Sequence, residues 1–343
     1  MTKEIIENDP YKSAGVDIGA GNELVDLIKE DVASSHNQNV LGNIGGFAGM
    51  FKLDKGYKNP ILVACTDGVG TKVALAQESN KLDNIGQDLV GMCVNDLVVC
   101  GAKPLFFLDY FASSKLEVSE ASRVIKSIAK ACKDSSCALL GGETAEMPGH
   151  YVGKNFDLAG FSVGCVDEDR VINNKTIKKN DVLIGIESSG PHSNGFSLIR
   201  KIIKETKLSI EEYDNLVDLA LKPTHLYPNL IMGLLEKFTI HGMAHITGGG
   251  LTENIPRSIP KNLAVNIDTN SWHMPEIFKW LQINGHLSNL DMYRIFNCGI
   301  GMVLIVREED SEPLMKEISK HNFKSFIIGN VVDKDANNSV VFK

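Results

Sequence analysis

Three acidic residues stand in segments whose apolar character would normally exclude a charge. Asp67 follows the run PILVACT, Asp96 lies inside IGQDLVGMCVNDLVVC, and Glu143 follows the glycine pair of CALLGGE. A carboxylate in such surroundings is costly unless it is paired or binds a cation, and Mg²⁺ prefers one or two carboxylates together with phosphate oxygens. The three residues therefore predict a metal–nucleotide site.

A purely structural role is the alternative for each acid. Asp67 could cap the helix predicted at KVALAQES, residues 72–79, and Asp96 could hydrogen-bond a turn. Capping explains Asp67 well. It does not explain a carboxylate placed between Val94 and Leu97.

The segment TDGVGTK, residues 66–72, has the glycines and lysine of a phosphate loop but not the spacing. A Walker loop needs G-x-x-x-x-G-K-[ST], whereas here the glycines lie two apart and Thr71 precedes Lys72. The dinucleotide fingerprint also fails, because Val73 stands where its third glycine would be. Neither common nucleotide loop fits, so Asp67 is more informative than Lys72.

Two glycine-containing segments lie at predicted strand–helix junctions in the second half of the chain. One contains His192, Ser193 and Asn194 in SSGPHSNGFSLIRKI, and the other contains His245 in HITGGGLTENIPR. Turns and helix caps alone could account for these residues. In the functional interpretation, exposed amides at a helix start bind phosphate and His192 acts as a donor or base. Two such sites indicate a small phosphorylated substrate.

Strand-like and helix-like patterns alternate along the chain, which predicts mixed α and β structure. We expect strands at 61–66, 104–112, 137–142, 182–189, 243–247, 299–306 and 323–332, a strand pair within 156–166, and helices at 23–32, 72–79, 85–100, 118–132, 196–205 and 275–284. The polar stretch 167–181 has no apolar periodicity and is the expected linker. We therefore divide the chain into domains at 1–168 and 169–343.

Composition limits the classes of function. Hydrophobic residues make up 43% and charged residues 23% of the chain, and the net charge is −8. This balance is typical of a globular protein and argues against broad contact with nucleic acid or an anionic membrane. The seven cysteines form no CxxC pair, no signal-like start is visible, and no run approaches the roughly 18 apolar residues of a membrane helix. We expect a cytoplasmic protein.

Together the motifs resemble the phosphoribosylformylglycinamidine cyclo-ligase family, also called aminoimidazole ribonucleotide synthetase, of purine biosynthesis. The resemblance spans nearly the whole chain, and its most specific parts are long. The matching segments are YKSAGVDIGAGNELV, TDGVGTK, IGQDLVGMCVNDLVVCGAKPLFFLDYFA, GGETAEMPG, DLAGFSVG, SSGPHSNGFSLIRKI, HITGGGLTENIPR and FNCGIGMV.

The resemblance implies an α+β fold of two domains, with the N-terminal domains of a homodimer pairing into a β-barrel and nucleotide bound between the domains. It implies a ring closure that depends on ATP and Mg²⁺. ATP phosphorylates the formamide oxygen of formylglycinamidine ribonucleotide, the ribosylamine nitrogen attacks that carbon, and ADP, phosphate and aminoimidazole ribonucleotide leave.

The resemblance also implies roles for individual residues. Asp67, Asp96 and Glu143 would hold Mg²⁺ on the ATP phosphates, and either His192 or His245 would move a proton, His192 being the first choice. The remaining roles fall on loop residues: Gly68, Gly70, Thr71 and Lys72 in the phosphate cradle, Gly45, Gly46 and Gly49 in a mobile cover, Ser193 and Asn194 on the substrate or the transferred phosphoryl group, and Gly248, Gly249 and Gly250 on the ribose phosphate.

Two alternatives remain from the sequence. The first is another ATP-dependent enzyme of the same superfamily, such as thiamine monophosphate kinase, which does not share PHSNG followed by GGGLTEN. The second is a dimer that senses nucleotide without turnover. Mere binding would not need Asp67, Asp96, Glu143 and His192 together, so the enzyme is favoured.

Overall fold

The computed structural model describes residues 10–42, 44–335 and 338–343, so positions 1–9 of the start lie outside it. The N-terminal half is built on a four-stranded sheet in the order β3-β6-β4-β5. β4 and β5 are parallel, whereas β6 runs antiparallel to β3 and to β4. The bounds are β3 Pro60–Gly68, β4 Lys103–Ser113, β5 Ala138–Glu146 and β6 Phe156–Asp167.

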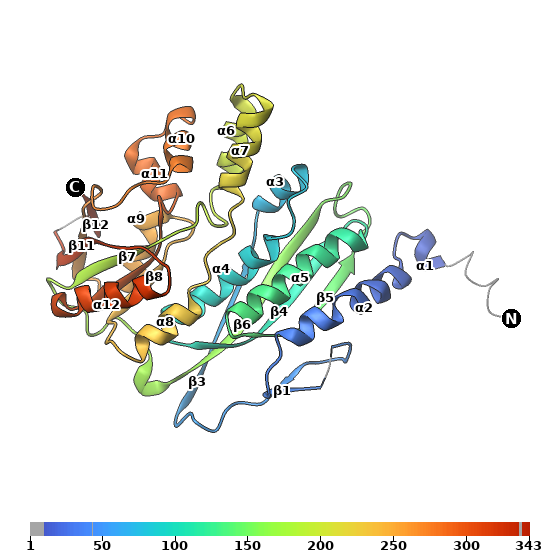
Figure 1. The fold of residues 1–343 in the computed structure, drawn as a ribbon, viewed down its shortest axis with the longest axis horizontal. Helices are drawn as coiled ribbons and strands as arrows, with labels where there is room; N and C mark the ends of the chain where they lie inside the picture. The colour runs from blue at the N-terminus through green and yellow to red at the C-terminus, as the bar shows by residue number, and fades with distance from the viewer. Residues whose placement is uncertain (1–9, 43, 336–337) are drawn as a thin grey trace.

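Helices cover one face of this sheet (Figure 1). The main helices are α2 (Ile18–Ser34), α4 (Ile85–Val99) and α5 (Val118–Asp134). Two short helices, α1 (Pro10–Ser13) and α3 (Lys72–Glu78), precede α2 and α4 in the chain. Buried and more exposed side chains alternate along the strands, because successive side chains point to opposite faces of a sheet. In β4, Phe107 and Phe111 are buried beneath the helices, whereas Phe106, Leu108 and Tyr110 on the other face stay partly exposed.

The prediction of a strand pair within 156–166 is wrong, because the segment forms the single strand β6. The segment contains two glycines, and neither breaks the strand. Gly160 instead makes room for the Phe107 ring and Gly164 for the Lys103 carbonyl, since a Cβ atom at either position would collide with them. These glycines therefore serve packing inside a continuous strand.

The C-terminal half contains a six-stranded sheet in the order β12-β9-β11-β7-β10-β8. Alternate residues of β10 enter two different clusters, Val303 in one and Met302 in the other, so both faces are buried and the apolar run is continuous. The strands are β7 Val182–Glu187, β8 Gly242–His245, β9 Leu263–Ile267, β10 Ile300–Val306, β11 Ser325–Asp333 and β12 Val340–Phe342.

Helices lie on both faces of this second sheet. Several were not predicted from the sequence, including the two between residues 210 and 235. The helices are α6 Phe196–Glu205, α7 Ile210–Ala220, α8 Pro228–Leu235, α9 Gly250–Asn254, α10 Glu276–Asn284, α11 Asn289–Ile295 and α12 Glu308–Lys320, with short 3₁₀ turns at Glu168–Arg170 and Ile255–Ser258. None of the helices in the described part of the chain has the length and apolar character needed to cross a membrane.

Helix α4 joins the two halves. It contacts β3, β4 and β6 of the first sheet, and it also contacts β8 and α8 of the second half (Figure 1). Polar residues on this helix therefore meet residues that are far away in the sequence. A small two-stranded ribbon, β1 (Val40–Leu41) with β2 (Met50–Phe51), lies outside both sheets.

Candidate active site

Asp67 lies near the end of β3 and on the face that α4 covers, since it pairs with the buried Gly160 of β6. Its Oδ1 accepts the backbone N–H of Gly68 at 2.8 Å. Burial raises the pKa of this carboxyl, and the nearby carboxylate of Asp96 raises it further. Asp67 does not cap α3, because the N-cap position of that helix is Thr71, whose side chain makes no hydrogen bond to the helix start. Capping therefore does not explain Asp67, and two acids near each other suit a bound cation.

Asp96 and His245 form a pair across the boundary between the halves. Asp96 Oδ1 lies 2.8 Å from His245 Nδ1, and the Asp96 side chain is 43% exposed whereas that of His245 is 2% exposed. Asn95 Nδ2 lies 3.4 Å from the other ring nitrogen of His245. If Nδ1 donates to the carboxylate, Nε2 is the acceptor for this amide, so one neutral tautomer satisfies both contacts. Asp96 thus presents a carboxylate outward while His245 supports it from behind.

The structure does not bring Glu143 to these two acids. Three strand intervals separate β3 from β5, about 14 Å at the usual spacing between strands. Glu143 also pairs with Tyr110 on the open face of the sheet, opposite to Asp67. Within the described ranges, no three His, Cys, Asp or Glu side chains form a group that could hold a metal ion. One ion shared by all three acids of a single chain is therefore inconsistent with the fold.

Lys72 differs most from its expected position in a phosphate cradle. Its side chain is fully buried, and its ammonium donates to Asp88 Oδ1 at 2.7 Å and to the carbonyls of His192 and Lys222, each at 2.8 Å. Burial lowers the pKa of Lys72 and raises that of Asp88. Since three acceptors use the three ammonium protons, Lys72 is not placed to face a phosphate.

His192 is also fully buried and lies near two other histidines. Its ring centroid is 6.2 Å from that of His225 and 6.5 Å from that of His245. Burial holds its pKa well below the usual value, and the neighbouring His245, His225 and Lys72 lower it further. Among the described residues, neither ring nitrogen of His192 finds a hydrogen-bond partner. The sequence placed His192 at an exposed helix mouth, whereas the structure places it behind the surface.

The two phosphate-loop candidates of the C-terminal half lie next to each other. Asn194 Nδ2 contacts the Met92 sulfur of α4 at 3.8 Å, and a Cβ on Gly248 would lie 3.3 Å from Asn194 Oδ1. Ser193 and Asn194 do not cap α6, because the N-cap position of that helix is Gly195, which has no side chain. Ser193 Oγ instead lies 3.5 Å from Thr224 Oγ1. Their side chains are thus not used as helix caps.

Within the glycine triplet, the three residues differ in exposure. Gly248 is exposed and Gly249 is half-exposed, whereas Gly250 is buried and its N–H donates to the Thr247 carbonyl at 3.0 Å. The Asn254 side-chain amide, which sequence reasoning missed, binds the carbonyls of Thr247, Gly248 and Gly250 and holds the loop. Only the first two glycines are open to an approaching ligand.

The glycine loop between β1 and β2 packs elsewhere on the N-terminal half. Gly45 and Gly46 are exposed, and Gly49 lies so close to Leu140 of β5 that a Cβ would collide with that side chain. Asn43 of the same loop lies outside the described residues. Thr71 is exposed and its hydroxyl lies 3.0 Å from that of Ser197 on α6, which joins the TDGVGTK segment to the second half. Gly68 is half-exposed beside it and Gly70, at φ 68°, is exposed.

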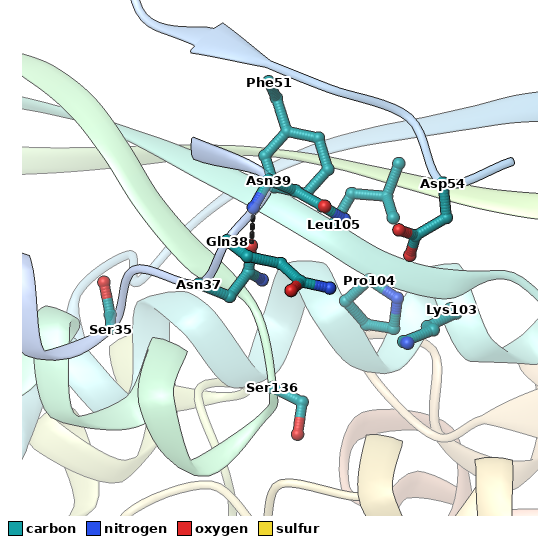
Figure 2. Close-up of a pocket in the computed structure, with 10 residues that line it drawn as sticks. All are labelled: Ser35, Asn37, Gln38, Asn39, Phe51, Asp54, Lys103, Pro104, Leu105 and Ser136. Carbon is teal, nitrogen blue, oxygen red and sulfur yellow. Dashed lines mark hydrogen bonds between the residues drawn. The ribbon is translucent and has the colours of Figure 1, made fainter. Parts of the chain in front are cut away.

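A surface pocket of about 480 Å³ lies apart from all these residues (Figure 2). It is formed at the start of β4, by the chain after α2, and by the turn before β5. Its lining is Ser35, Asn37, Gln38, Asn39, Phe51, Asp54, Lys103, Pro104, Leu105 and Ser136. None of the predicted site residues lines it. The candidate active site is therefore the junction of β3, α4 and β8, not this pocket.

Comparison with known proteins identifies the family of this chain. The N-terminal domain model of AIR synthase related proteins matches residues 47–166, and the C-terminal domain model matches residues 178–341. A phosphoribosylformylglycinamidine cyclo-ligase of Neisseria meningitidis serogroup C is 53% identical over 88% of this chain and 89% of its own length. The chain belongs to the phosphoribosylformylglycinamidine cyclo-ligase family. The resemblance drawn from the motifs is thereby confirmed.

Other cyclo-ligases match over even more of the chain. One from Neisseria gonorrhoeae is 50% identical over 95% of this chain and 96% of its own length. One from Geotalea daltonii is 49% identical over 96% of this chain and 97% of its own length. Solved structures share the fold at low identity. Thiamine-monophosphate kinase from Stenotrophomonas maltophilia gives a TM-score of 0.66 at 15% identity, covering 92% of this chain and 96% of that one. Hydrogenase maturation protein HypE in complex with ATP gives a TM-score of 0.66 at 16% identity, covering 96% of this chain and 93% of that one.

Proposed function

We propose that this protein is the ATP-dependent ligase that converts formylglycinamidine ribonucleotide into 5-aminoimidazole ribonucleotide, releasing ADP and phosphate. Membership of the cyclo-ligase family carries this assignment. The site agrees with it, because carboxylates of the N-terminal half meet a histidine and a glycine loop of the C-terminal half. We retain the division at 168/169 as the domain boundary.

Asp67 and Asp96 are the metal-binding residues of this proposal. Asp96 Oδ1 is engaged with His245, whereas Oδ2 accepts only a weak contact of 3.7 Å from the Cys65 thiol, so Oδ2 is the oxygen that would bind an ion. The raised pKa of Asp67 suits a carboxyl that ionises fully when a cation arrives. Two carboxylates plus phosphate oxygens match the preference of Mg²⁺. When bound, Mg²⁺ neutralises the phosphate charge and stabilises the transferring phosphoryl group. Glu143 would serve a second ion on the open face.

The exposed part of TDGVGTK would form the rest of the ATP site. Gly68, Gly70 and Thr71 offer backbone and hydroxyl groups at the end of β3. Gly45, Gly46 and Gly49 remain the proposed cover. Lys72 would act indirectly, because its ammonium is already satisfied inside the protein.

In the reaction, ATP phosphorylates the formamide oxygen, and the ribosylamine nitrogen then attacks the same carbon and expels phosphate. The attacking nitrogen loses a proton as the ring closes. We assign that proton to Nε2 of His245, since His245 is joined through Nδ1 to the exposed carboxylate of Asp96. His192 makes no such contact, because neither of its ring nitrogens has a hydrogen-bond partner among the described residues. His192 would support the pair from behind. Ser193, Asn194, Gly248 and Gly249 would hold the substrate and its phosphate, with Gly250 shaping their loop.

The open face of the four-stranded sheet supports a homodimer in which two N-terminal domains pair into a β-barrel. Leu62 is 65% exposed and Phe161 is 44% exposed on this face, beside the partly exposed Phe106, Leu108 and Tyr110. A contiguous apolar sheet face is typical of an interaction surface. We expect Phe161→Arg to give monomers in analytical ultracentrifugation. Ile210→Arg, at an exposed apolar site on α7, should leave the dimer intact; a dimeric Phe161→Arg protein would refute this pairing.

The direct test is an assay for the product. Purified protein is mixed with ATP, Mg²⁺ and formylglycinamidine ribonucleotide, and the diazotisable aminoimidazole is measured. Product that depends on ATP and Mg²⁺ supports the proposal. Bound ATP with no product at any Mg²⁺ concentration would favour a nucleotide sensor instead.

We also propose a cytoplasmic location, because the seven cysteines are free thiols, as in reducing compartments.

A further inference from the structure

A buried ion pair lies next to the candidate site without being part of its exposed surface. Lys72 begins α3 and Asp88 lies in the first turn of α4, and both side chains are 0% exposed at an Nζ–Oδ1 distance of 2.7 Å. Taking two charges out of water is expensive, and a well-packed apolar pair is often equally stable. Stability alone is therefore a weak explanation for placing these charges here.

The two charged groups both bind loops of the other half. The Lys72 ammonium donates to the carbonyls of His192 and Lys222, and Asp88 Oδ1 accepts the backbone N–H of Thr224 at 2.8 Å and its hydroxyl at 2.7 Å. His192 has a φ of 57°, a left-handed conformation that is unfavourable for most residues with a side chain. The Lys72 bond to its carbonyl fixes that residue in this conformation.

The segment Lys222–Tyr227 continues along α4 beyond the ion pair. Asn95 Nδ2 donates to the His225 carbonyl at 2.9 Å, and Asn95 Oδ1 accepts the Tyr227 N–H at 3.0 Å. Gly91 lets the segment approach, because a Cβ there would lie 2.8 Å from Thr224 Cγ2. Positions 88, 91 and 95 share one face of a helix. The next residue along α4 is Asp96, which is paired with His245.

We propose that Lys72 and Asp88 are positioning residues for the reaction: they hold the His192 loop and the segment Lys222–Tyr227 against α4, and so set the placement of the substrate loops relative to the carboxylates. This inference rests on the proposed function. Neither side chain can touch substrate, since both are buried, and their effect passes through the backbone of the two loops. The pair thus aligns groups that come from opposite halves of the chain.

The test is the double variant Lys72→Met/Asp88→Leu, which removes both charges and keeps apolar groups of similar size, so that no unpaired charge is left buried. We expect a folded protein whose kcat falls at least tenfold and whose KM for formylglycinamidine ribonucleotide rises, while the Kd for ATP·Mg²⁺ changes less than threefold. Lys81→Met is the matched control, because Lys81 also forms an ion pair between the halves, with Asp218, but at the exposed surface. It should keep wild-type kinetics.

Wild-type kcat and KM in a folded double variant would overturn the inference. If the double variant does not fold, Thr224→Val decides, because it removes the hydroxyl bond to Asp88 and leaves the ion pair in place. We expect a two- to fivefold loss of kcat with a raised substrate KM, and unchanged kinetics would again overturn the inference. Failure of the proposed function is distinguishable, since the wild-type protein itself would then form no product.

Discussion

Replacing His192 with Asn should weaken the dependence of stability on pH. The imidazole is buried among His225, His245 and Lys72, which together with burial hold its pKa well below the usual value near 6.5. The native protein therefore keeps the ring neutral, while the unfolded chain takes up a proton as the pH falls below about 6.5. Because only the unfolded chain gains this proton, the free energy of unfolding falls as the solution is acidified.

The magnitude follows from linkage for a single proton. Each pH unit below the pKa of the unfolded chain costs up to about 1.4 kcal/mol, as long as the native ring stays neutral. Integrated from about pH 7.5 to about pH 5.5 for an unfolded pKa near 6.5, His192 alone removes about 1.4 kcal/mol from the free energy of unfolding. Burial also lowers the pKa values of His225 and His241. These two residues reduce the free energy of unfolding at acidic pH in wild type and variant alike.

The assay is urea unfolding at these two pH values, followed by fluorescence or circular dichroism. Asn is the chosen replacement because it tolerates the left-handed φ of 57° at this position. We expect the loss of stability between the two pH values to be smaller in His192→Asn than in wild type by about 1.4 kcal/mol. His286→Asn is the matched control, since His286 is exposed and has a φ of 51°, and it should retain the wild-type pH dependence. Equal losses in His192→Asn and wild type would show that the native ring takes up its proton, and would refute the reasoning from burial.

Other substitutions test separate parts of the site. Asp96→Asn should lower kcat by orders of magnitude, because the charge proposed to bind metal is lost, while thermal unfolding stays near wild type since the Asn side-chain oxygen can still accept from His245. Glu143→Gln should reduce kcat far less than Asp96→Asn in the same assay, and an equal loss would place Glu143 at the same ion. Tyr227→Phe should cost about 1–2 kcal/mol in urea unfolding, because the buried hydroxyl donates to the Glu187 carbonyl at 2.8 Å, which would lose its partner; an unchanged midpoint would contradict that assignment.

Much of the fold could be predicted from local patterns. The helix expected at residues 196–205 coincides with α6, and the apolar run near residues 300–306 is a strand buried on both faces. Periodicity and end signals are local, so these elements were readable without knowing their neighbours.

The site was predictable where a residue conflicted with its surroundings. Asp96 stood out as a carboxylate in an apolar helix, and it proves to be bound to His245, a residue 149 positions away in the chain. Lys72 and His192 gave no such conflict, because their burial is created by loops that are distant in sequence. Asn95 was passed over beside Asp96, although an amide within the same apolar helix was the same kind of signal. It joins α4 to the segment before α8.

These contacts imply that neither half forms the site alone. The N-terminal half supplies Asp67 and Asp96, whose neighbouring charges favour a cation, and it exposes no lysine in TDGVGTK to replace one, since Lys72 is buried. The C-terminal half supplies the imidazole that orients Asp96 and the glycine loop after β8. Because His245 and that loop are consecutive in the chain, the contact that orients the Asp96 carboxylate also fixes where the glycine loop begins. If the proposed roles hold, binding of metal and placement of substrate are coupled through this single strand end.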